Sequence, residues 1–196
     1  VERINELRKL GFIRTNTKDG LRVATYKELA RFDPGFSFDD PVLKGCRGVV
    51  YEEDTGLIVG HCMPKFFNVN EREETKYANL PNENYTVLNK EDGSMLTSFV
   101  YKGKLYHTTK GSFNNIYVDH AYKYLPDMPY GDAITLVSEI RIPDDVEEMA
   151  RVTRRPEGLY LITAYHNSTG KEFDRDFCEY LAKLFNIGIV DKINMT

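Results

Sequence analysis

The 196-residue sequence has no tryptophan, only three cysteines and no long hydrophobic run. The cysteines, at positions 46, 62 and 178, are odd in number and widely spaced, which argues against a disulfide framework and against a zinc knuckle. No apolar run approaches the roughly 20 residues that span a bilayer, and the charged N-terminus lacks the apolar core of a signal peptide. These absences predict a protein of a reducing cytoplasm with no membrane partner.

An excess of positive charge is also missing. The chain has 26 Lys and Arg against 30 Asp and Glu, a net charge of −4. Nonspecific binding to nucleic acid depends on a surplus of cations, so composition disfavours it and leaves room only for a local basic groove. With 41% hydrophobic and 29% charged residues, the chain is expected to form one compact domain that buries roughly 70% of its unfolded surface.

The hydrophobic periodicity predicts a mixture of helices and strands. Helices are expected at residues 2–10, 117–125 and 174–185, the last capped by Asp174. Strands are expected at residues 47–52, 57–61, 85–90, 95–101, 104–109, 133–140 and 159–165. The first two are expected to pair as a hairpin, and the next three as a meander whose last two strands form a hairpin at the turn Lys102-Gly103. Helices and strands do not alternate in a strict βαβ order, so the predicted class is α+β with antiparallel sheets.

Lys90 ends one of these predicted strands and precedes the acidic turn Glu91-Asp92-Gly93. A lysine here can direct its amine into a cleft from a rigid element, and a glycine lets a ligand approach the backbone closely. An amine nucleophile must be deprotonated when it attacks, which neighbouring cations or partial burial favour. Asp-Gly is also a common turn signal beside which a lysine is usually solvated, so this segment alone favours an ordinary strand end.

Five segments, taken in order, form a far more specific pattern. They are Cys46-Arg47-Gly48, Pro64-Lys65-Phe66-Phe67-Asn68, Lys90-Glu-Asp-Gly-Ser94, Thr109-Lys110-Gly111-Ser112 and Leu136-Val-Ser-Glu139-Ile. Between about residues 45 and 173 the sequence resembles the ATP-dependent RNA ligases of tailed bacteriophages, which are covalent nucleotidyltransferases. The resemblance implies a nucleotidyltransferase (adenylation) domain with antiparallel sheets flanked by helices.

The resemblance also implies a reaction, its cofactors and its partners. Lys90 would attack the α-phosphate of ATP to form lysyl-AMP, with Mg²⁺ or Mn²⁺ as the metal. AMP would then pass to an RNA 5′-phosphate, and a 3′-hydroxyl would displace it; broken tRNA is the family's usual substrate. The implied ATP- and AMP-binding residues are Arg47, Lys65, Phe67, Lys90, Gly93, Lys110 and Glu139.

Their implied roles follow from the same resemblance. The cations Arg47, Lys65 and Lys110 would contact phosphates or the nucleic-acid end, Phe67 would stack on adenine, and Gly93 would make close backbone contact. Glu139 would bind the ribose or the metal. Cations placed around a transferred phosphoryl group stabilise its charge, and an aromatic face holds a purine without a charge.

Single residues among these segments also fit ordinary structural roles. We interpret Phe66 as a core residue and Asp92 as a hydrogen-bonding residue of the turn, not a catalytic base. Glu139 is balanced between a ligand contact and a strand-end charge. The four histidines have no metal-ligand spacing and no Cys or Ser partner, so no role is assigned to them.

Two later motifs of the family, a glutamate-glycine segment and paired lysines, are expected further along the chain. Glu157-Gly158 follows Glu139 too soon to be the first of these, and no Lys-x-Lys pair follows it. We therefore expect residues 1–196 to be a single adenylation domain that stops before motifs IV and V. Two alternatives remain open: a noncatalytic protein that binds a nucleotide or RNA end or assists assembly, and a DNA ligase or mRNA capping guanylyltransferase.

Overall fold

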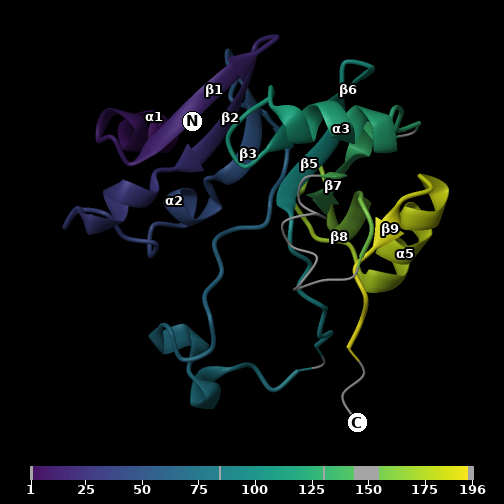
Figure 1. The fold of residues 1–196 in the computed structure, drawn as a ribbon. Coiled ribbons are helices and arrows are strands. Elements are labelled where there is room, and N and C mark those ends of the chain that lie inside the picture. The colour runs from purple at the N-terminus through teal and green to yellow at the C-terminus, as the bar shows by residue number, and fades with distance from the viewer. Residues whose placement is uncertain (1, 84, 130, 144–154, 194–196) are drawn as a thin grey trace.

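The structure is a computed structural model that describes residues 2–83, 85–129, 131–143 and 155–193, and it contains two β-sheets (Figure 1). The first sheet has the order β1-β2-β3-β4, formed by Ile13–Lys18, Leu21–Tyr26, Arg47–Glu52 and Ile58–Gly60. The second has the order β6-β5-β7-β8-β9, formed in chain order by β5 (Ser94–Tyr101), β6 (Lys104–Thr109), β7 (Ile134–Arg141), β8 (Gly158–His166) and β9 (Gly188–Ile189). The pairs are antiparallel except β8 with β9, which confirms the predicted α+β class.

Helices cover the outer faces of both sheets. Helices α1 (Glu2–Lys9) and α2 (Pro41–Gly45) lie by the first sheet, and α3 (Ile116–Tyr124) and α5 (Arg175–Leu184) lie by the second (Figure 1). Short 3₁₀ turns are η1 (Glu28–Phe32), η2 (Glu73–Thr75), η3 (Tyr77–Asn79) and η4 (Gly131–Ala133). The side chain of Asp174 accepts from the Phe177 N–H at 2.8 Å, so the predicted N-cap of α5 is confirmed. In the part of the chain that the structure describes, no helix is long and apolar enough to cross a membrane.

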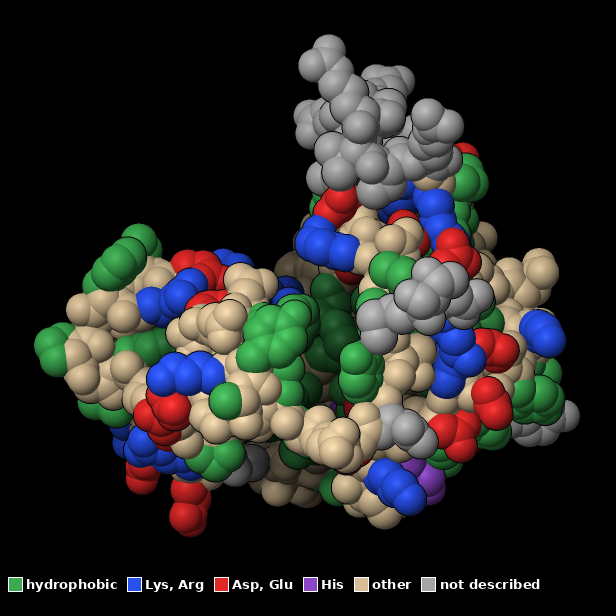
Figure 2. Space-filling view, turned by 90° about the horizontal axis from the view of Figure 1, so that it is seen from below, with side chains coloured by type: hydrophobic (Ala, Val, Ile, Leu, Met, Phe, Trp, Pro, Cys, Tyr) green, Lys and Arg blue, Asp and Glu red, His purple; other side chains and the backbone are tan. Residues whose placement is uncertain are grey.

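Three hydrophobic clusters hold the molecule together. One lies beneath the helices of each sheet, and the third joins the sheets through Leu21, Val23, Val50, Val59, Phe99, Tyr106 and Phe113. Gly60 is part of this contact, because a Cβ there would lie 2.9 Å from Cδ1 of Phe99. Seen from below, the surface is hollowed between two lobes, and hydrophobic side chains gather around the hollow (Figure 2).

Both predicted hairpins form, as β3–β4 and β5–β6, but the predicted strand at residues 85–90 is wrong. This segment is extended, and it runs below the sheets before it enters β5 (Figure 1). Within the described residues, a bridge joins its Leu88 to Lys192, far along the chain. A β-branched and aromatic composition therefore produces an extended backbone here, but its partner is remote and the pairing stays isolated.

Candidate active site

Lys90 lies in the extended segment that leads into β5, and its side chain is 85% exposed. Its ammonium group donates a hydrogen bond to the Asp92 carboxylate two residues later. Asp92 thus bonds within the turn, as the sequence predicts, and its partner is the Lys90 side chain. The amine is open to solvent, with a carboxylate beside it.

Gly93 allows the turn to lie directly against β7. A Cβ built on it would be 2.3 Å from the Ile140 carbonyl oxygen and 3.1 Å from Cγ of Arg141. Real Cβ atoms essentially never approach another heavy atom this closely, so any side chain here would force the turn away from the strand. The glycine therefore has a packing role in addition to the close ligand approach expected from the sequence.

Glu139 lies on β7, which pairs directly with β5. Burial raises the pKa of its carboxyl group to about 7, and Asp92 nearby adds to the rise. The Lys90 ammonium, the Gly93 backbone N–H and Arg47 oppose this shift, because each stabilises the ionised carboxylate. The structure thus brings Arg47, Lys90 and Gly93 together around Glu139, although they come from separate parts of the sequence.

Arg47 is the first residue of β3, and its side chain faces the segment that follows β4. The guanidinium carbon lies 4.7 Å from the centroid of the Phe66 ring. Its Nη1 atom is buried and has no hydrogen-bond acceptor among the residues that the structure describes. A buried charged donor without a partner is costly, so this position suits an anionic ligand.

Lys65, Phe66 and Phe67 stand together after β4. The Lys65 ammonium donates to the Phe66 carbonyl oxygen at 2.5 Å and lies 4.6 Å from the centroid of Phe67. Burial lowers the pKa of Lys65, and the neighbouring Arg47 contributes in the same direction. Glu71 opposes this shift, so the ammonium is partly desolvated among charges of both signs.

The two phenylalanines have different surroundings from those predicted. Phe66 is 57% exposed, so its interpretation as a core residue is wrong. Phe67 is half-buried and packs edge-on against Phe38 with 5.7 Å between ring centroids. Successive side chains of an extended segment point to opposite sides. Phe67 packs against the aromatic cluster beneath the first sheet, so Phe66 points away from it.

Lys110 follows β6 and lies against the first sheet. Its ammonium pairs with Glu28 at 2.9 Å and lies 4.1 Å from the centroid of Tyr26. Gly48 has φ +116°, and a Cβ there would be 3.3 Å from the Lys110 Cα, so this glycine lets the two segments meet. The Lys110 ammonium lowers the pKa of the Glu28 carboxyl group, because their hydrogen bond stabilises the ionised carboxylate.

Sequence reasoning missed Glu28, which lies in η1 outside the five segments. Nothing in the local sequence marks it, because its role depends on the contact of η1 with the loop after β6. Within the described ranges, no group of three or more His, Cys, Asp or Glu side chains is arranged to hold a metal ion.

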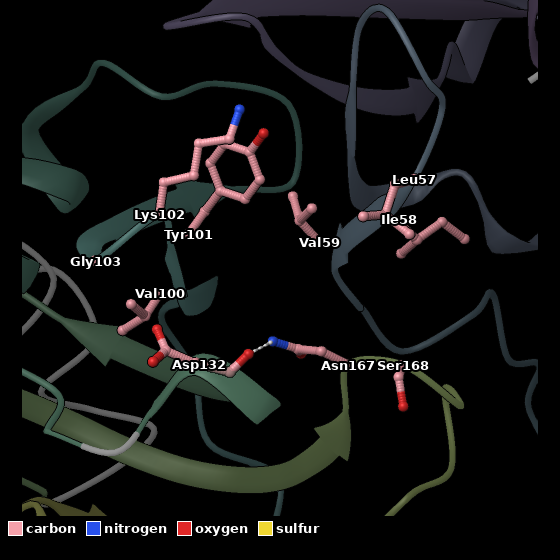
Figure 3. Close-up of a pocket in the computed structure, with 10 residues that line it drawn as sticks. All are labelled: Leu57, Ile58, Val59, Val100, Tyr101, Lys102, Gly103, Asp132, Asn167 and Ser168. Atoms are coloured by element: carbon pink, nitrogen blue, oxygen red, sulfur yellow. Dashed lines mark hydrogen bonds between the residues drawn. The ribbon is translucent and has the colours of Figure 1, made fainter.

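A cavity of about 430 Å³ lies between β4 and the β5–β6 turn (Figure 3). Apolar side chains, Ile58, Val59 and Val100 among them, form much of its wall. At its polar edge the Asn167 side chain donates to the Asp132 carbonyl oxygen at 3.0 Å. None of the ten described residues that line this cavity belongs to the predicted site.

Comparisons with known proteins agree with the motifs. Among curated proteins, a candidate RNA ligase of Thermovibrio ammonificans is 30% identical over 95 residues, which cover 48% of this chain and 25% of that protein. Two solved structures have TM-scores of 0.63: a candidate ATP-dependent DNA ligase from Aquifex aeolicus and an archaeal ATP-dependent RNA ligase, at 15% and 13% identity. Each covers 98% of this chain and 50% of the solved chain, which shows a shared fold over half of the larger protein.

A family model described as RNA ligase matches residues 45–196. That range contains every residue of the predicted site, from Arg47 to Glu139, and both sheets contribute to it. The chain belongs to the RNA ligase family.

Proposed function

We propose that this chain supplies the nucleotide-transfer (adenylation) domain of an ATP-dependent RNA ligase, with Lys90 as the nucleophile. The observation that supports it best is that the turn carrying Lys90 and Gly93 packs directly against β7 beside Glu139, whose carboxyl group also senses the charge of Arg47. These residues come from three of the five segments that carry the family resemblance. Membership of the RNA ligase family and the fold shared with ATP-dependent ligases support the same proposal.

The proposed reaction has three steps. The lone pair of the Lys90 Nζ attacks the α-phosphorus of ATP, the bond to the β-phosphate oxygen breaks, and pyrophosphate leaves while the amine loses a proton. An oxygen of an RNA 5′-phosphate then attacks the same phosphorus, the P–N bond breaks, and the lysine regains a proton. Finally an RNA 3′-hydroxyl attacks the activated 5′-phosphate, loses its proton and expels AMP.

Catalysis of this kind depends mainly on cations placed around the transferred phosphoryl group. Arg47, Lys65 and Lys110 are the proposed phosphate ligands. The buried, unpartnered Nη1 of Arg47 and the partly desolvated ammonium of Lys65 are suited to an anion. Phe67 stays the proposed adenine platform, and the exposed ring of Phe66 is the second surface on which a base can stack.

A divalent cation, Mg²⁺ or Mn²⁺, fits this donor set. Mg²⁺ usually keeps several waters and binds through one or two carboxylates together with substrate phosphates. Glu139 would hold it, with Asp92 close by, and a cation there would favour the ionised form of a carboxyl group whose pKa burial raises to about 7. When bound, the metal would neutralise negative charge on the phosphates.

The direct test is covalent labelling. The protein is incubated with α-labelled ATP and Mg²⁺ or Mn²⁺, then resolved on a denaturing gel. Label should remain on the wild-type chain and be lost in Lys90→Ala. Lys104→Ala is the matched control, because Lys104 is also exposed and paired with a carboxylate, that of Asp19, and should label normally.

Four further results separate the alternatives. Label that persists in Lys90→Ala would exclude this lysine as the nucleophile. Tight ATP binding without release of pyrophosphate would favour a noncatalytic nucleotide-binding protein. Competition by GTP for the adduct would favour a capping enzyme, and transfer of AMP to DNA ends in preference to RNA ends would favour a DNA ligase.

A further inference from the structure

The backbone before Lys90 is tied to the C-terminal part of the chain. The Asn89 N–H donates to the Asp191 carbonyl oxygen at 2.8 Å. One residue earlier, Leu88 bridges to Lys192, and the Ile193 N–H donates to the Val87 carbonyl oxygen at 2.9 Å. The residues that immediately precede the proposed nucleophile are therefore held by backbone contacts from about 100 positions away.

The residue after Lys90 is held through its side chain. The Glu91 side chain is only 2% exposed, and its Oε1 lies 3.0 Å from Nε of Arg155. Both carboxylate oxygens are buried and accept no hydrogen bond from the residues that the structure describes, so this ion pair supplies the compensating charge that a buried carboxylate needs. Lys90, with its side chain in solvent, therefore stands between two anchored neighbours.

Arg155 connects the two anchors. Its Nη2 pairs with the Asp191 carboxylate, and its Nη1 donates to the Ile189 carbonyl oxygen at 3.2 Å. The guanidinium also lies over the ring of Tyr160, with 4.8 Å to the centroid. Asp191 accepts the Asn89 N–H on its main-chain oxygen and pairs with Arg155 through its side chain. Arg155 is therefore connected to both sides of Lys90: to Glu91 directly and to Asn89 through Asp191.

We propose that Arg155 is a positioning residue for Lys90: by binding Glu91 and Asp191 together it fixes the backbone on both sides of the nucleophile. This inference rests on the proposed function of Lys90. The Lys90 side chain is exposed and pairs with Asp92 of the same turn, so its reach depends on where the backbone of this turn is held. A misplacement of about 1 Å can lower the rate about 100-fold.

The first test separates chemistry from binding. Arg155→Ala and Glu91→Gln should lower the rate of lysyl-AMP formation at saturating ATP by about 10- to 100-fold, while the Kd for ATP stays unchanged. Guanidinium ions added to Arg155→Ala should restore part of the rate, because they can occupy the space between the two carboxylates. The double variant should be no slower than Arg155→Ala, since both changes break one connection.

Arg175→Ala is the matched control. Arg175 donates to the Val190 carbonyl oxygen at 2.6 Å and pairs with Glu179, which in turn pairs with Lys192. It therefore also holds the C-terminal segment, but through Val190 and Glu179 instead of through Glu91 and Asp191. It should lower thermal stability and leave the rate of adduct formation near that of the wild type. Equal loss of rate in Arg175→Ala and Arg155→Ala, in proportion to their loss of stability, would overturn the proposal.

The second test does not depend on catalysis. Deuterium uptake by the peptide 86–92 should rise in Arg155→Ala and Glu91→Gln and stay unchanged in Arg175→Ala. Unchanged uptake in both Arg155→Ala and Glu91→Gln would refute the positioning role, whatever the rates of lysyl-AMP formation. A wild-type protein that forms no lysyl-AMP would instead refute the proposed function, and the uptake comparison would still decide whether Arg155 orders the segment.

Discussion

Replacing Gly93 with alanine tests how the turn that carries Lys90 is placed. The added Cβ would lie 2.3 Å from the Ile140 carbonyl oxygen, well inside the 3.0 Å that real Cβ atoms essentially never cross. Ile140 is fully buried on β7 and paired with Ser94 of β5, so the strand resists movement. The turn must therefore shift by roughly 1 Å, at a cost of about 1–3 kcal/mol for overpacking.

The same shift should displace the nucleophile, so Gly93→Ala should also slow lysyl-AMP formation by about 100-fold. Urea denaturation measures the first effect and single-turnover labelling with ATP measures the second. Gly45→Ala is the control, because a Cβ there meets nothing within 4 Å and its expected change in stability is no more than about 0.5 kcal/mol.

Two results would refute this reasoning. Gly93→Ala with wild-type stability would mean that the close approach to β7 does not require a glycine. A loss of stability without a loss of labelling rate would mean that the turn can move without carrying Lys90 away from ATP.

Three further predictions concern residues around the sheets. Burial lowers the pKa of His107 to about 4, so the unfolded chain binds the additional proton between about pH 4 and 6.5. Stability should fall by about 3 kcal/mol as the pH drops through that window, and denaturation of His107→Gln at pH 7 and pH 4 should lack this part of the loss. Phe66→Ala should weaken ATP or RNA binding by about 1 kcal/mol or more with little change in stability, whereas Phe67→Ala should lower stability; calorimetric titration and urea denaturation distinguish them. Glu28→Gln removes the carboxylate that pairs with Lys110 and should tighten ATP binding several-fold at low salt, while Lys110→Ala should weaken it in the same titration.

Local sequence patterns predict the local parts of this fold. The β3–β4 and β5–β6 hairpins form as expected because each pair of strands is joined by a short turn, and α5 begins after its Asp174 cap as expected. The interval 85–90 shows the limit of such patterns. Its composition indicates an extended backbone, but its pairing with the segment near Lys192 is determined by the tertiary fold.

The phenylalanine pair shows a second limit. Alternation predicts that Phe66 and Phe67 face opposite sides, but it does not say which side is the interior. Phe38 and the other aromatic residues beneath the first sheet decide this, because they offer Phe67 an edge-on contact. Glu28, Glu91 and Arg155 escape prediction for the same reason: each acts through a contact with a segment distant in the sequence.

A net charge of −4 is compatible with a cationic site, because a bound phosphate interacts with the charges beside it and not with the total charge of the protein. At physiological salt, charges on the surface are screened beyond about 8 Å, so a phosphate responds to the side chains beside it and little to the total. Around Lys65, Arg47 and Arg31 disfavour the ammonium form while Glu28 and Glu71 favour it. This mixture gives a local positive field that neighbouring carboxylates moderate, so binding of ATP should depend on salt through these few cations and not through the acidic surface.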